Sequence, residues 1–266
     1  MNSFTKMAVC AMAFVGLSIV SAETFNLAEK NYLKKQLGNH STTGTEFTTK
    51  GMTFLLASKS FDIDPAKKYS FKMTVSEKNS KRTRVYIGFI LYDVNGRAYA
   101  AHCWQGHAPS FTQVTKAAKK GDTVIYVKNG SGWVAAGTFY IALNAKADGS
   151  DIPNTNVITN TMKSKEKKGD EWVITLKQPL KADIAAGTNV RQNIAGGYYY
   201  SVIKDIKPSE KEVVLTGTVQ GYKKEASAFD GKTWPAAVKK ARLLILADWF
   251  NAGADISYKD ATFVIE

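Results

Sequence analysis

Aromatic residues beside predicted loops are the side chains of this sequence best suited to binding a ligand. Trp104 and Gln105 end one predicted strand, and Trp249 ends another within Asp-Trp-Phe-Asn. Tyr198 and Tyr200 alternate onto one face of a third strand. A sugar ring stacks a C–H face on an aromatic plane and needs polar side chains for its hydroxyl groups, so these residue types together indicate sugar binding. The candidate ligand-binding residues are Trp104, Gln105, Tyr198, Tyr200, Trp234 and Trp249.

The alternative interpretation is that these rings fill the protein core. Large aromatic side chains bury much apolar area, and for any single one, such as Trp234 in the loop Gly-Lys-Thr-Trp-Pro, this interpretation stands. Several of the rings, however, cluster near predicted loop ends. That clustering favours at least one of them as a binding platform.

Residue types that catalyse reactions or bind a transition metal are few. The histidines are His40, His102 and His107, and there is no G-x-S-x-G motif. His102 and Cys103 would point to opposite faces of a strand, so the spacing to His107 does not predict a zinc site. Carboxylate pairs that cleave glycosides meet only in space. We therefore expect a protein that is not an enzyme, and a glycoside hydrolase or lyase is the less favoured alternative.

The first 22 residues have the pattern of a cleavable export signal. Lys6 precedes an uncharged, mostly apolar run at 7–20, and small residues at Ser21 and Ala22 predict cleavage before Glu23. The run of about 14 residues is shorter than the ~20 that a membrane-spanning helix needs. These features predict a secreted or periplasmic protein without a transmembrane segment.

Charge and cysteine content narrow the choice of partners. The 36 Lys and Arg against 23 Asp and Glu leave a net charge of +13, or +12 once Lys6 is removed with the export signal. This charge favours acidic or sulfated glycans or a membrane surface, although it also serves solubility alone. No nucleic-acid-binding motif is present, so we do not expect nucleic acid as a partner. Cys103 alone remains after cleavage and is expected to be a buried, unreactive thiol.

Short apolar runs bounded by turn residues predict a chain made almost entirely of β-strands. Residues 69–75 alternate apolar and polar side chains, whereas 85–92 are apolar on both faces and predict a central strand. Asn95-Gly96 predicts a turn, after which 97–104 resumes a strand. Further strands are predicted at 198–203, 212–219, 242–250 and 261–265. The helical signals are short, at 28–37 and 235–240.

The middle of the chain predicts a separate unit. Between Phe111 and Gly196, short apolar runs are each bounded by Gly, Asp or Pro. Gly106-His-Ala-Pro109 on one side and Gly196-Gly197 on the other are typical of crossings between domains. The basic run from Lys163 to Lys168 predicts a solvated hairpin tip.

Two parts of the chain resemble known families. Phe61-Asp-Ile-Asp-Pro-Ala-Lys-Lys-Tyr69, Tyr92-Asp-Val-Asn-Gly-Arg97 and the closing Asp255-Ile-Ser-Tyr-Lys-Asp-Ala-Thr-Phe-Val264 resemble jelly rolls of carbohydrate-binding modules, in the broad galactose-binding-like group of secreted bacterial proteins. The middle unit resembles small β modules of secreted and phage-tail proteins. Its matching segments are Gly121-Asp-Thr-Val-Ile-Tyr-Val127, Ile174-Thr-Leu-Lys-Gln-Pro-Leu180 and Gly187-Thr-Asn-Val190.

The resemblance to carbohydrate-binding modules implies a site and a metal. Members of that group bind sugars on a concave sheet face or at loop tips through aromatic platforms, and many hold a structural calcium ion (Ca2+) near the first and last strands. Asp260 matches one such ligand position, with Asp62 and Asp64 as further candidates. Calcium needs six to eight oxygen ligands. An ordinary turn explains Asp-x-Asp before Pro equally well.

The sequence therefore predicts an all-β protein. We expect a jelly-roll-like β-sandwich formed by 23–110 and 196–266, with an inserted β module at 111–195. The leading functional prediction is non-catalytic binding of an extracellular polysaccharide or other glycan, including an anionic one. The alternative is a structural or adhesive envelope component whose partner is another envelope protein.

Overall fold

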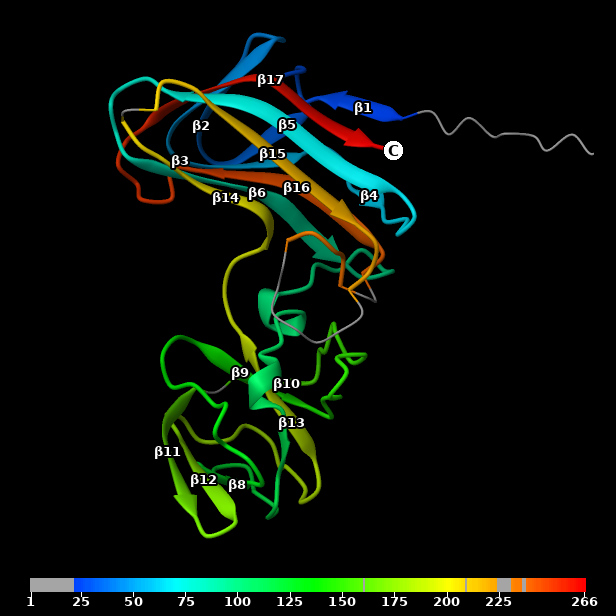
Figure 1. The fold of residues 1–266 in the computed structure, drawn as a ribbon, viewed down its shortest axis with the longest axis vertical. Coiled ribbons are helices and arrows are strands. Elements are labelled where there is room, and N and C mark those ends of the chain that lie inside the picture. The colour runs from blue at the N-terminus through cyan, green and yellow to red at the C-terminus, as the bar shows by residue number, and fades with distance from the viewer. Residues whose placement is uncertain (1–21, 160, 209, 224–230, 236–237) are drawn as a thin grey trace, which may run out of the picture.

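The computed structural model describes residues 22–266, apart from 160, 209, 224–230 and 236–237 (Figure 1). These residues form β-strands and two short 3-10 helices, as expected for an all-β protein. The predicted export signal lies outside the described residues, except for Ala22. In the described part of the chain, no helix has the length and apolar character needed to cross a membrane.

A ten-stranded antiparallel sheet forms the larger part of the molecule. Its strand order is β14-β6-β16-β3-β17-β5-β15, with β1 beside β17, β2 beside β3 and β4 beside β16. The strands are β1 (Glu23–Asn26), β2 (Leu33–Thr42), β3 (Glu46–Ala57), β4 (Phe61–Asp62), β5 (Lys68–Glu77), β6 (Thr83–Tyr92), β14 (Tyr199–Ile206), β15 (Val213–Gln220), β16 (Lys240–Ala247) and β17 (Asp255–Ile265). The end strands β14 and β15 contact each other, so the sheet curls nearly into a barrel (Figure 1).

Strand β6 carries apolar side chains on both faces, as its sequence predicts. Val85, Ile87 and Phe89 point inward and are fully buried in the core. Tyr86, between them, points to the outer face, where it is also largely buried. The curled sheet therefore has a hydrophobic interior and, over part of its outside, a second apolar surface.

The interior is built around Trp234, whose side chain is completely buried. Its ring lies 5.2 Å from that of Tyr69, 4.9 Å from that of Phe89 and 5.5 Å from that of Tyr199, measured between centroids. Such edge-to-face and offset contacts add to the apolar area that the rings remove from water. Trp234 therefore packs the core and offers no ring face to a ligand.

Two small antiparallel sheets are formed by the middle of the chain. One has the order β10-β9-β13-β7 and the other β11-β12-β8. Their strands are β7 (Thr112–Gln113), β8 (Val124–Val127), β9 (Phe139–Leu143), β10 (Val157–Thr159), β11 (Met162–Lys168), β12 (Glu171–Leu176) and β13 (Asn189–Ile194). A second hydrophobic core, which includes Ile125, Trp133, Ile174 and Val190, lies within these sheets. Figure 1 shows both sheets below the main one.

A buried ion pair joins two segments of this middle part. Arg191 is fully buried and donates to both carboxylate oxygens of Asp151, at 3.1 and 2.9 Å. Burial alone would raise the pKa of the Asp151 carboxyl, but hydrogen bonds from Arg191, the Lys146 amide and Asn154 lower it overall. Gly106 leaves room for this guanidinium, since a Cβ at that position would lie 2.7 Å from Arg191 Nε.

The structure differs from the sequence-based expectation in two segments, 97–104 and 28–37. Residues 97–104 do not resume a strand, because after one bridge between Tyr92 and Ala98 the chain forms the 3-10 helix η1 (Ala101–Cys103). The predicted helical turns at 28–37 give way to strand β2 from Leu33, which pairs with β3. Part of the predicted 235–240 turn, residues 236–237, lies outside the described residues.

We predict that Asp151→Asn lowers the free energy of unfolding by about 3 kcal/mol, because it leaves the buried Arg191 charge without its partner. Glu166→Gln is the matched control, since the Glu166–Lys168 pair is exposed and should change stability by about 0.5 kcal/mol or less. Urea unfolding followed by far-UV circular dichroism measures both. Equal stability of the two variants would contradict the assigned role of the Arg191–Asp151 pair.

Candidate functional site

Five aromatic side chains form a continuous strip on the outside of the main sheet. This aromatic strip consists of Phe54, Tyr86, Tyr198, Tyr200 and Trp249. Ring centroids are 5.3 Å apart for Phe54 and Tyr198, and 4.6 Å apart for Tyr86 and Tyr200. Tyr198 meets Tyr200 at 6.3 Å, and Tyr86 meets Trp249 at 5.8 Å.

Sheet register explains how residues so far apart in sequence meet. Leu246 of β16 pairs with Phe54 of β3 on one side and with Tyr86 of β6 on the other. Side chains opposite one another in paired strands share a face, so all three lie on the outside of the sheet. Leu246 is nearly buried there, as are Leu56 and Leu244. The strip is therefore supported by its own layer of leucines.

Gly88 lets Tyr198 and Tyr200 reach this surface. A Cβ at Gly88 would lie 1.9 Å from the Tyr199 carbonyl oxygen, so only glycine permits the close approach of β14 to β6 there. A bulge between Tyr200 and Val202 shifts the register at the same place. Tyr199 points into the core, while its two neighbours lie on the outer face.

Trp249, at the end of the strip, lies in a loop formed by residues 248–254. Hydrogen bonds to one buried carboxylate, that of Asp248, hold this loop in its conformation. Asp248 is completely buried and has a left-handed backbone, with φ of 51°. Its carboxylate accepts hydrogen bonds from the amides of Ala252, Gly253 and Ala254, at 3.2, 2.9 and 3.1 Å. The Thr83 hydroxyl donates a fourth, at 3.1 Å. The loop is thereby fixed to the first residue of β6.

Exposed rings and guanidinium groups meet at this loop. Trp249 is 51% exposed and Phe250 is 41% exposed, which is unusual for residues of this size. The guanidinium carbons of Arg82 and Arg84 lie 5.2 and 4.8 Å from the Phe250 ring centroid. Both arginines also bind Asp205, and their hydrogen bonds lower the pKa of its carboxyl to about 2. Two cations against one anion leave this end of the strip positively charged.

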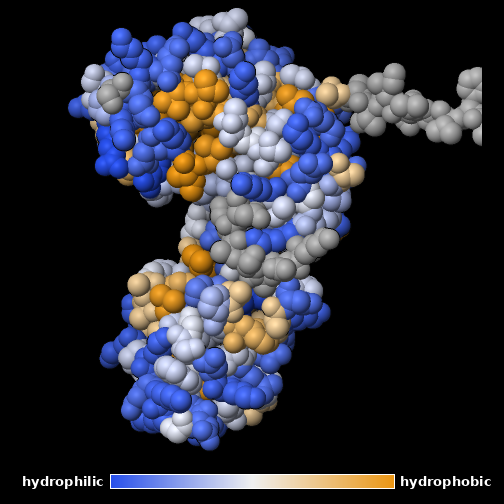
Figure 2. All heavy atoms as spheres, in the orientation of Figure 1, coloured by the Kyte–Doolittle hydropathy of each residue, from blue (hydrophilic) through white to orange (hydrophobic). Residues whose placement is uncertain are grey.

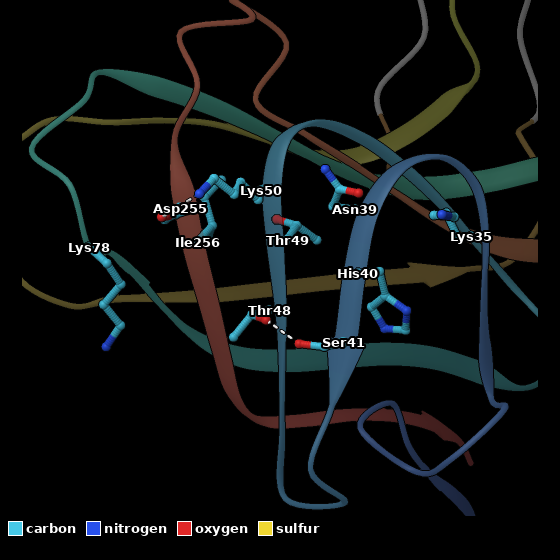
Figure 3. Close-up of a pocket in the computed structure, with 10 residues that line it drawn as sticks. All are labelled: Lys35, Asn39, His40, Ser41, Thr48, Thr49, Lys50, Lys78, Asp255 and Ile256. Atoms are coloured by element: carbon cyan, nitrogen blue, oxygen red, sulfur yellow. Dashed lines mark hydrogen bonds and ion pairs between the residues drawn. The ribbon is translucent and has the colours of Figure 1, made fainter.

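A cationic groove lies on the other side of the same loop (Figure 3). It has a volume of about 480 Å³ and is lined by Lys35, Asn39, His40, Ser41, Thr48, Thr49, Lys50, Lys78, Asp255 and Ile256. The Ser41 and Thr48 hydroxyls are 2.7 Å apart, and Lys50 Nζ lies 4.0 Å from an Asp255 carboxylate oxygen. Burial, and then the charge of Lys35, lower the pKa of His40, so the imidazole is neutral at pH 7.

The six residues proposed from the sequence divide into two groups. Tyr198, Tyr200 and Trp249 come together in the aromatic strip. Trp104 and Trp234 instead belong to the hydrophobic core, where both pack near Tyr199. Gln105 is half-buried near the junction of the sheets, where its carbonyl accepts from the Ile194 amide at 2.8 Å.

Sequence reasoning missed Phe54, Tyr86 and the groove lysines. Tyr86 lies in the run that is apolar on both faces, and this pattern was the available signal for a second apolar surface. Phe54 and Lys50 belong to β3, a strand that was not predicted. Their neighbours in space are distant in sequence, so no local pattern could assign them to a site.

The residues considered for metal binding or catalysis do not assemble. In the described part of the chain, no three His, Cys, Asp or Glu side chains are grouped so that they could hold a metal ion. Asp260 is exposed at a bulge of β17. His102 stacks on Tyr140 at 3.9 Å, and His107 Nε2 lies 3.1 Å from the Gly132 carbonyl oxygen. Cys103 is a buried free thiol whose pKa is raised by burial.

Neither the models of known protein families nor the curated proteins contain a match to this chain. The geometry of the strip and groove is therefore the basis for inferring a function.

We predict that Asp248→Asn lowers the free energy of unfolding by about 2 kcal/mol and loosens the 248–254 loop. Asparagine tolerates the left-handed backbone, but its NH2 group cannot accept from the loop amides. Hydrogen exchange should become faster at Ala252, Gly253 and Ala254. The control Glu212→Gln removes an exposed charge, 4.0 Å from Lys259, and should leave these amides protected. Unchanged exchange in Asp248→Asn would contradict this role of the carboxylate.

Proposed function

We propose that this chain is a non-catalytic module that binds extracellular polysaccharide on the aromatic strip. The observation that carries the proposal is the exposed Trp249 ring, held on a rigid loop at the end of a row of aromatic side chains. A pyranose ring stacks its C–H face on such a plane, and a rigid platform loses little conformational entropy on binding.

Polar groups beside the rings support a sugar over a purely apolar ligand. Arg82 is largely exposed, and its guanidinium has more donors than Asp205 can occupy. The Tyr86 and Tyr200 hydroxyl groups lie within the strip and can donate or accept. Stacking surface and hydrogen-bonding groups are thus available to one ligand.

The wider architecture that we propose follows the resemblance to carbohydrate-binding modules. In this proposal the curled main sheet is a jelly-roll-like domain of 23–110 and 196–266, and the small sheets form an inserted module at 111–195. The export signal at 1–22 would deliver the protein to the periplasm or the exterior, where polysaccharide is the expected partner.

A protein partner is the second candidate function, and a different surface favours it. Ile203 of β14 and Val214 of β15 are more than half exposed, on the two strands that end the main sheet. Figure 2 shows hydrophobic side chains gathered in this region among hydrophilic ones. Exposed apolar patches with polar surroundings are typical of protein-binding sites, so a structural or adhesive envelope protein would use this face.

We predict that Trp249→Ala weakens binding to a recognised polysaccharide at least tenfold, because it removes the exposed stacking surface. A glycan array, probed with the mature chain from Glu23 onward, first identifies that polysaccharide. Titration calorimetry then compares Trp249→Ala with Trp172→Ala, a half-buried tryptophan in the small sheets that lies outside the strip.

The comparison of variants separates the two candidate functions. Loss of binding in Trp249→Ala but not in Trp172→Ala is the expected result, provided that both variants keep the far-UV spectrum of the parent. If the folded parent protein binds no glycan, the proposal that it binds polysaccharide is wrong. In that case a partner docking at Ile203 and Val214 becomes the leading function.

A further inference from the structure

We infer that the cationic groove binds the carboxylate or sulfate groups of an anionic polysaccharide. This inference builds on the proposed function, because it assigns the groove to the same ligand that stacks on the aromatic strip. It adds a second contact site, and it requires the ligand to carry negative charge, which stacking alone does not.

The groove has a strong excess of positive charge. Lys35, Lys50 and Lys78 line it and are all exposed, whereas Asp255 is its one acidic lining residue. Asp255 lies at the limit of an ion pair, 4.0 Å from Lys50 Nζ. Within the described part of the chain, Lys35 and Lys78 form no ion pair with an acidic side chain, so their ammonium groups are available to a ligand.

Neutral polar groups accompany these charges. Asn39 pairs across the sheet with Lys50, and Ser41 pairs with Thr48 in the adjacent part of the same ladder. Amide and hydroxyl groups suit the hydroxyl groups of a sugar, because they can both donate and accept. Ammonium groups act as point charges toward carboxylate or sulfate. The lining therefore offers a partner to each of the two kinds of group that an acidic sugar presents, its hydroxyl groups and its carboxylate or sulfate.

Strand β3 connects the groove to the aromatic strip. Lys50 and Phe54 both belong to this strand and pair with Asn39 and Leu37 of β2, on either side of a bulge that contains Gly51. Three residues lie between Lys50 and Phe54, so their Cα atoms are roughly 13 Å apart or less. One extended polymer can therefore contact both sites.

The 248–254 loop fixes the relative position of the two sites. Its Ala254 carbonyl accepts from the Gly51 amide at 2.9 Å, and its Gly253 carbonyl accepts from Asn79 Nδ2 at 2.8 Å. Trp249, the second residue of the loop, lies on the strip side, and Asp255 follows the loop on the groove side. Because the loop is held at both ends, the spacing of sugar and acid contacts along a bound chain is preset.

The lining favours a glycan over a membrane surface. Membrane-binding segments insert exposed apolar side chains beside their basic residues. The groove instead presents Asn39, Ser41 and Thr48 between its lysines, and its one aliphatic lining residue, Ile256, is buried. An anionic lipid surface is therefore the competing ligand that the test must exclude.

The test uses the mature chain and three polymers, polygalacturonate for carboxylate, dextran sulfate for sulfate and pullulan as a neutral polymer. The groove variant combines Lys35→Gln, Lys50→Gln and Lys78→Gln. The control combines Lys163→Gln, Lys167→Gln and Lys168→Gln on the exposed strand β11, with the same change of charge. Affinity electrophoresis and titration calorimetry at 50 and 500 mM salt measure the affinities.

We predict that the groove variant loses at least tenfold in affinity for an anionic polymer at low salt and less than twofold for pullulan, whereas the control loses less than twofold for both. Equal losses in the two triple variants would show nonspecific attraction and overturn the inference. So would competition by phosphatidylserine vesicles that depends on the groove lysines.

Failure of this inference can be distinguished from failure of the proposed function. If pullulan binds through Trp249 but neither anionic polymer depends on the groove, only the inference is wrong. If an anionic polymer needs the groove but not Trp249, stacking on the strip is wrong and the groove assignment stands. If a folded parent binds none of the polymers, both are wrong.

Discussion

The buried carboxylate of Asp248 is the constraint on which the outer surface depends. Three backbone amides and the Thr83 hydroxyl satisfy its oxygen atoms. A buried carboxylate without such donors would be strongly destabilising, so the loop conformation and the charge require each other. The consequence is a rigid turn that exposes Trp249 and Phe250 rather than folding them into the core.

Around this turn, the main sheet uses its two faces differently. The inner face packs Trp234, Tyr69 and Phe89 into a continuous core, which supplies stability. The outer face carries the leucine-supported aromatic strip, and further along β3 lies Lys50 of the groove. Stacking and charge recognition can therefore share one rigid scaffold without compromising the core.

The small sheets are stabilised by other interactions than the main sheet. They have their own hydrophobic core, and the buried Arg191–Asp151 pair ties β13 to the segment before β10. Removing one partner of such a pair would leave an uncompensated buried charge, so each residue requires the other. Close approaches at Gly106 show that the crossing between the parts is tightly packed as well.

Periodicity in the sequence was enough to predict the β-rich fold and strands such as β5 and β6. It failed at β3, because Thr, Lys and a central Gly51 interrupt the apolar alternation over Glu46–Ala57. It also predicted a strand at 97–104, where Trp104 packs inward from a 3-10 turn. Tyr198, Tyr200 and Trp249 were identified by residue type and loop position. Phe54 and Tyr86 were missed, because only pairing across three strands brings them to the strip.

The indole N–H signals of the tryptophans test the central claim most directly. The chain has five tryptophans, so a two-dimensional 15N–1H spectrum of the mature protein should resolve five such signals. During titration with a polysaccharide that binds, we predict that the Trp249 signal shifts while those of Trp104, Trp133, Trp172 and Trp234 stay in place. Binding that leaves Trp249 unshifted, or that shifts Trp172 instead, would contradict recognition on the aromatic strip.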